Sequence, residues 1–173
     1  MPDASHPAFA AIDWERWSPD VEATLLYVVR DGRLLLIHKK RGLGAGKLNG
    51  PGGKVDEGET PQEAAVREFE EELAARPVDP ERVGEVAFDV LGGVSIRIHV
   101  FLALDLVGTP VETDEAIPVW VPLADPPYDR MWEDDRYWLP LLIEGRPFRA
   151  RTLFDEDRLL GIEVLPDPRH PTP

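Results

Sequence analysis

The segment GGKVDEGETPQEAAVREFEEELAA, residues 52–75, decides both the fold and the chemistry expected of this 173-residue chain. Thr60 is a favourable N-cap, Pro61 suits the first helical position, and Glu63 completes a capping box. We therefore expect a helix over residues 60–75, which ends because two prolines follow closely.

Helical spacing sorts the side chains of this segment into two stripes. The apolar stripe predicts the core-facing side: Val66, Phe69 and Leu73, with Gln62 and Ala65 beside them. The acidic stripe lies about 100° away by helical arithmetic: Glu68, Glu71 and Glu72. Like charges at this spacing repel by about 0.2–0.5 kcal/mol per pair, and one arginine, Arg67, can orient a carboxylate without neutralising the group. Oxygen-only ligands favour Mg²⁺ or Mn²⁺ over zinc as the compensating cation.

A Glu-rich helix face is more often a solvated surface, and the residues upstream argue against that reading here. Gly53, five residues, Glu59, seven residues and then the hexapeptide at 67–72 form a spaced pattern that resembles the Nudix box. The pattern departs from the family at its end, where Ala74-Ala75 replaces a glycine and an aliphatic residue.

This resemblance implies an α/β (α+β) Nudix fold, in which a mixed β-sheet is sandwiched between helices. It also implies that Mg²⁺ is held by the three glutamates and by the Gly52 carbonyl, with Arg67 part of the catalytic group. Bound metal would neutralise phosphate oxygens and activate water. We expect Glu115 to add a ligand or a base, and Lys39 and Lys54 to meet phosphate oxygens; a surface role is the alternative for each.

The rest of the chain predicts mostly strands. A hairpin is expected around Asp31-Gly32, between runs at 23–30 and 33–38. Further runs predict strands at 83–90, 94–104, 118–121, 148–154 and 159–165. Asp134 or Asp135 is expected to cap a second helix, which runs to about residue 142. We place the hydrolase domain at 22–165. Residues 1–21 are an N-terminal extension docked through its Trp rings, and 166–173 are a flexible tail.

Composition limits the partners. The formal net charge of −14 argues against nucleic acid polymers and anionic membranes, which need a basic surface. All four lysines nevertheless fall between Lys39 and Lys54, within the Gly-rich region. The absence of cysteine excludes disulfides and thiolate sites, and no apolar run predicts a signal or a membrane span. We expect a cytoplasmic monomer or dimer whose partner is a small nucleotide.

Three stretches that extend beyond the box, residues 38–60, 108–115 and 131–142, are similar to one branch of the family. This branch, the animal-type MutT homologues, hydrolyses oxidised purine nucleoside triphosphates, and the similarity covers roughly residues 22–165. In that branch the adjacent acids Asp134 and Asp135 would meet the base edge, and one must be protonated to donate to an oxidised guanine. Asn49 can offer a donor and an acceptor, and Trp132 can stack on the base. Thr24 and Phe88 match two further pocket positions of these enzymes. The sequence departs from them at Leu43, Leu48 and Pro51, where they have aromatic residues.

We therefore expect a Mg²⁺-dependent pyrophosphohydrolase that converts 8-oxo-dGTP-type nucleotides to the monophosphate and pyrophosphate. A Nudix hydrolase of another substrate, an ordinary dNTP or a nucleotide sugar, is the first alternative. The second alternative is a Nudix-fold module that binds a nucleotide without hydrolysing it. Such a module is expected to lack one or more of the metal-binding glutamates, whereas this sequence has Glu68, Glu71 and Glu72.

Overall fold

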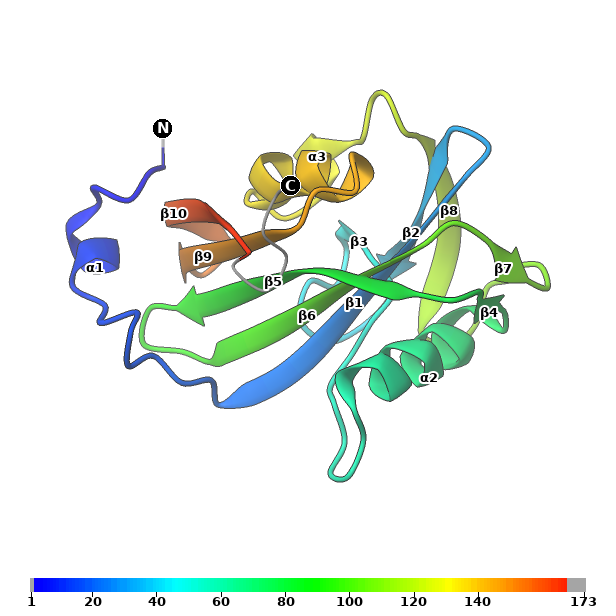
Figure 1. Ribbon diagram of the computed structural model, residues 1–173, viewed down its shortest axis with the longest axis horizontal. Helices are drawn as coiled ribbons and strands as arrows, with labels where there is room; N and C mark the ends of the chain where they lie inside the picture. Colours follow the sequence, from blue (N-terminus) through cyan, green and yellow to red (C-terminus); the bar gives the residue numbers. More distant parts are fainter. Residues whose placement is uncertain (1, 168–173) are drawn as a thin grey trace.

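The computed structural model, which describes residues 2–167, is built around an eight-stranded mixed sheet (Figure 1). Its strands are β1 (Val21–Arg30), β2 (Arg33–Lys39), β3 (Leu48–Asn49), β5 (Glu81–Val90), β6 (Ser95–Ala103), β8 (Ala116–Pro122), β9 (Phe148–Asp155) and β10 (Arg158–Pro166). The order is β10-β9-β5-β6-β1-β2-β3, and β8 also pairs with β2. The β1–β6 and β5–β9 pairs are parallel, while the other pairs are antiparallel.

Two helices cover opposite faces of this sheet (Figure 1). The remaining elements are α1 (Pro7–Ala10), α2 (Pro61–Leu73), α3 (Asp135–Ile143), a short 3-10 turn η1 (Tyr128–Arg130) and the small pair β4 (Arg76–Pro77) and β7 (Leu106–Val107). Alternation along β1 places Leu26 and Val28 in the core under α2 and Tyr27 in the core under α3. The expected sheet between helices is therefore confirmed.

Local signals in the sequence account for the turn between β1 and β2 and for the two ends of α2. Asp31 and Gly32 have φ values of 53° and 70°, as a primed hairpin turn requires, and Arg30 pairs with Arg33. The capping box of α2 is formed on both sides, as expected. The helix ends at Leu73, earlier than expected, because Ala74 adopts the left-handed conformation with φ 53° and ψ 32°.

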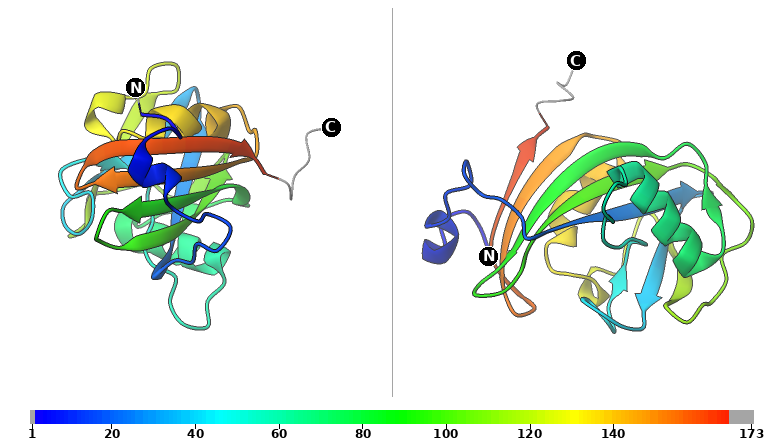
Figure 2. Two further views of the ribbon diagram at one scale, coloured as in Figure 1. Left: turned by 90° about the vertical axis from the view of Figure 1, so that its left-hand side faces the viewer. Right: turned by 90° about the horizontal axis from the view of Figure 1, so that it is seen from below.

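The N-terminal extension packs against β9 and β10, at the end of the sheet away from α2 (Figure 2). Phe9 is buried against Leu153 and Leu160 of the outer face of β9 and β10. The Trp17 indole donates a hydrogen bond of 2.7 Å to Asp89, so docking of the extension involves a Trp ring, as expected.

The chain end differs from its prediction at two residues. Pro166 is the last residue of β10 and pairs with Phe148, and Asp167 is buried. Residues 168–173, the rest of the expected tail, lie outside the described residues. Within residues 2–167 no helix is long and apolar enough to cross a membrane.

Candidate active site

Arg67 is the centre of the acidic face of α2. Its guanidinium makes two hydrogen bonds with the Glu59 carboxylate, of 2.6 and 2.9 Å, which hold the pKa of Glu59 at about 2. The same group donates to Glu68 at 2.9 Å, to Glu71 at 3.4 Å and to the Lys54 carbonyl at 3.1 Å. Arg67 therefore orients three carboxylates rather than one, and it ties the preceding loop to the helix.

The Gly52-Gly53 turn lies directly against the carboxylates of α2. The Gly52 amide donates to Glu72 at 2.7 Å, and a β-carbon on Gly53 would lie 2.3 Å from the Glu68 carboxyl carbon. Burial is the main reason that the pKa of Glu72 is raised to about 8; the charges of Glu68 and Glu115 act in the same direction, and the Gly52 hydrogen bond acts against them. An alanine at position 53 would have to displace the Glu68 carboxyl group.

The donor chemistry of this group fits a hard divalent cation. Glu72 is almost fully buried, accepts from a neutral amide and lies near two further acidic groups, so its ionised form is unfavourable unless a cation binds beside it. All the candidate ligands are oxygen atoms, as Mg²⁺ prefers. Among the described residues no three carboxylate or imidazole groups already form a ligating cluster. Arg67 binds Glu68 and Glu71 instead.

Glu115 lies near this group but points to a different partner. Its carboxylate forms a 3.1 Å ion pair with Arg41, and its charge contributes to the raised pKa of Glu68 and of Glu72. Lys39 lowers the pKa of Glu72 and lines the adjacent pocket. The Lys54 side chain is exposed and lies outside the pocket lining, so a phosphate contact by this residue stays a prediction.

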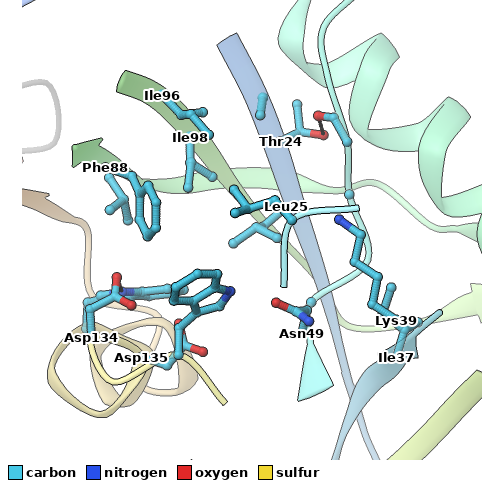
Figure 3. Close-up of a pocket in the computed structure, with 18 residues that line it drawn as sticks. Thr24, Leu25, Ile37, Lys39, Asn49, Phe88, Ile96, Ile98, Asp134 and Asp135 are labelled. Carbon is cyan, nitrogen blue, oxygen red and sulfur yellow. Dashed lines mark hydrogen bonds between the residues drawn. The ribbon is translucent and has the colours of Figure 1, made fainter. Parts of the chain in front are cut away.

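A pocket opens between the sheet and the start of α3 (Figure 3). All the residues expected to bind a nucleotide, except Lys54, line it: Thr24, Lys39, Asn49, Phe88, Trp132, Asp134 and Asp135. Gly52 and Gly53 line it too, so the pocket and the carboxylates of α2 share one turn. Figure 3 shows Asp134 and Asp135 across the pocket from Ile96 and Ile98.

The acid pair is buried in this pocket. Burial raises the pKa of Asp134 to about 6 and that of Asp135 well above its usual range, the latter also because of the Asp134 charge. The Trp138 indole donates to Asp134 at 3.0 Å, while the Asp134 Oδ1 atom is buried without a hydrogen-bond partner. Asp134 occupies the N-cap position of α3 but its side chain makes no capping bond, so the expected capping role is wrong.

Asn49 and Trp132 complete the polar and aromatic walls. The Asn49 amide group donates to the carbonyls of Gly44 and Lys47, both at 3.2 Å, which leaves its carbonyl oxygen for a ligand. The sequence predicts instead that the Asn49 side chain offers both its donor and its acceptor to the base. The Trp132 ring packs edge-on against Phe88, with the ring centroids 5.3 Å apart.

Sequence reasoning missed most of the apolar wall. It consists of aliphatic and aromatic residues from four strands and α3: Ala23, Leu25, Ile37, Val86, Ile96, Ile98 and Trp138. Pairs two residues apart on one strand share a face, so alternation was the available signal. Of the three departures from the family, Leu43 lines the pocket, whereas Leu48 and Pro51 are buried outside its lining.

Two known proteins are similar to this chain in sequence over most of its length. The oxidized purine nucleoside triphosphate hydrolase of Mus musculus is 41% identical over 143 residues, which cover 82% of this chain and 92% of the mouse protein. The protein of the same name from Danio rerio is 42% identical over 126 residues, which cover 72% of this chain and 81% of the zebrafish protein.

A solved structure has the same fold. The crystal structure of a MutT protein from Bacillus halodurans superimposes with a TM-score of 0.76 at 23% identity, covering 86% of this chain and 99% of that one. The family model described as the NUDIX domain matches residues 19–142. This chain therefore belongs to the Nudix hydrolase family.

Proposed function

We propose that this enzyme hydrolyses oxidised purine nucleoside triphosphates, of the 8-oxo-dGTP type, to the monophosphate and pyrophosphate. The observation that carries the proposal is the turn shared by the two halves of the site. Gly52 and Gly53 line the pocket that holds the acid pair, and the same glycines contact Glu72 and Glu68. A base bound in the pocket thus places its phosphates toward the carboxylates.

The pocket supplies the hydrogen-bond pattern that an oxidised purine needs. A carbonyl on the base edge requires a donor, and a buried acid pair with raised pKa keeps a proton for that purpose. The Asn49 carbonyl accepts a hydrogen bond from a base N–H, since its amide group is bound to the loop. Trp132 and Phe88 offer aromatic surface to the base.

Nudix hydrolases generally use a divalent metal, and we infer Mg²⁺, with Mn²⁺ as a substitute. The residues that would hold it are Glu68, Glu71, Glu72, Glu115 and the Gly52 carbonyl. When bound, the cation neutralises phosphate oxygens and lowers the pKa of a water molecule. Arg67 positions Glu68 and Glu71, and Lys39 and Lys54 neutralise the phosphate chain. To bind the cation, Glu115 would have to give up its ion pair with Arg41.

The remaining parts of the proposal concern the protein as a whole. We infer a hydrolase domain at 22–165 with a docked extension at 1–21, acting on a small nucleotide in the cytoplasm as a monomer or dimer. An alternative substrate, an ordinary dNTP or a nucleotide sugar, is favoured by one observation: the pocket is lined by Leu43 where the oxidised-purine enzymes have an aromatic residue.

Pyrophosphate release from 8-oxo-dGTP and from dGTP at low micromolar concentration, with and without Mg²⁺, tests the proposal. We expect Mg²⁺-dependent release with a strong preference for the oxidised base. The variants Asn49→Ala and Asp134→Asn should lose this preference and keep basal hydrolysis, while the exposed control Asp129→Asn should keep both. Equal turnover of the two nucleotides, or selectivity unchanged in the variants, would assign the enzyme to another substrate.

A further inference from the structure

We propose that Tyr27 is a positioning residue that fixes the spacing between Asn49 of β3 and Asp134 at the start of α3, the two base-reading groups of the pocket. The inference rests on the proposed function, because it concerns how the same pocket recognises a base. Tyr27 is on β1, is 1% exposed, and lies behind the pocket rather than in its lining. It touches no substrate, so its effect must pass through its neighbours.

One end of the Tyr27 ring rests on the backbone next to Asn49. A β-carbon on Gly50 would lie 2.5 Å from Cζ of Tyr27 and 2.9 Å from its hydroxyl oxygen. Gly50 does not have a positive φ, so glycine is needed here for the close approach and not for an unusual backbone conformation. The Gly50 backbone is also a hydrogen-bond partner of the phenol.

The other side of the ring faces the residue that holds the acid pair. Tyr27 packs edge-to-face on Trp138, with ring centroids 6.1 Å apart and an interplanar angle of 68°. Trp138 in turn stacks on Phe148 at 5.4 Å and donates its indole N–H to Asp134 at 3.0 Å. The indole is therefore clamped between two rings, and the position of its N–H fixes the Asp134 carboxyl.

Gly50, Tyr27, Trp138 and Asp134 thus form an unbroken series of contacts from the residue after Asn49 to the Asp134 carboxyl. Two groups that bind the same base edge must keep their separation within about 0.5 Å, and side chains locked by packing achieve this better than free ones. The contact series crosses from β1 to α3 and involves the residue after Asn49.

The hydroxyl itself indicates that the contact is specific. A buried hydroxyl without a hydrogen bond costs free energy, and a phenylalanine would fill the same core space without that cost. Burial, together with the charges of Asp135 and Asp134, raises the pKa of Tyr27 well above 10, so the hydroxyl is neutral and adds no charge to the acid pair. Its role is geometric.

Tyr27→Phe tests the inference, because it keeps the ring against Trp138 and removes only the hydroxyl at Gly50. Tyr128→Phe is the matched control, since that phenol also feels the Asp135 charge but belongs to η1, away from Gly50. We expect the KM of Tyr27→Phe for 8-oxo-dGTP to rise about tenfold, as for one lost hydrogen bond, while kcat and the KM for dGTP stay within about twofold.

A substrate-independent measurement separates this inference from the proposed function. Amide hydrogen exchange of Gly50 in the free enzyme should accelerate about tenfold in Tyr27→Phe and stay unchanged in Tyr128→Phe. Unchanged exchange at Gly50, or a lowered Tm with unchanged selectivity, would overturn the positioning role. If wild-type enzyme does not prefer 8-oxo-dGTP but the exchange at Gly50 responds, the proposed function fails and the contact series stands.

Discussion

Gly53→Ala separates the chemistry of the site from its stability. The new methyl carbon would lie 2.3 Å from the carboxyl carbon of Glu68 and 2.5 and 2.6 Å from its two oxygens. Ordinary contact begins at 3.4 Å, so the carboxyl group must move by about 1 Å. The backbone of Gly53 does not have a positive φ, and only a flexible side chain has to move.

The expected effect falls on turnover. A displacement of about 1 Å in a positioned group costs about 10²-fold in rate, so kcat should fall by that factor. The free energy of unfolding should change by less than about 1.5 kcal/mol, as for a tolerated change of side-chain volume. Gly52→Ala is the contrast, because its methyl carbon would lie 1.8 Å from the Thr24 carbonyl oxygen, which belongs to a strand and cannot move aside.

Steady-state kinetics with Mg²⁺ and urea unfolding, applied to both variants, measure the two effects. Gly52→Ala should lose stability and activity together, whereas Gly53→Ala should lose activity alone. Combined with Glu68→Ala, the Gly53→Ala change should have little further effect, because both remove the same carboxylate position. Wild-type kcat in Gly53→Ala, or equal destabilisation by both alanines, would refute the reasoning.

Three further predictions concern stability. Ala74→Gly should raise the free energy of unfolding by about 0.5–1 kcal/mol in urea titration, because Ala74 has φ 53° and glycine adopts that conformation without strain. Phe9→Ala should lower it by about 3 kcal/mol and leave kcat unchanged, since the ring is buried far from the acid pair against Leu153; a kcat loss would contradict this. The raised pKa of Asp134, about 6, means that ionisation opposes folding, so stability should fall as pH rises from about 4 through 6. Asp134→Asn should flatten that decline in unfolding curves measured between pH 4 and 8, and an unchanged slope would argue against the burial effect.

Features that depend on near neighbours were predictable from the sequence. The capping box joins Thr60 to Glu63, three residues away, and the Asp31-Gly32 turn depends on two adjacent residues. The strand runs were visible because alternation is a property of each segment. The glutamate spacing on α2 was visible for the same reason, and together with Gly53 and Glu59 upstream it carried the resemblance to the family, which implied the expected ligands.

Interactions across long separations depended on the tertiary structure. Trp138 donates to Asp134, four residues away, but Trp138 packs against Tyr27 of β1 and Phe148 of β9, and burial in the folded chain is what raises the pKa of the acid pair. The contact of Tyr27 with Gly50 likewise needs β1 and the loop after β3 side by side.

The sequence by itself thus determined the helix, the hairpin, the carboxylate stripe and the family. Only the tertiary structure decided that the Gly52 amide donates to Glu72, that the Lys54 side chain is exposed and that an aliphatic wall faces the acid pair. The physical reason is that backbone capping and periodicity are local, whereas desolvation and side-chain distance are set by segments tens of residues apart, which meet only in the folded chain.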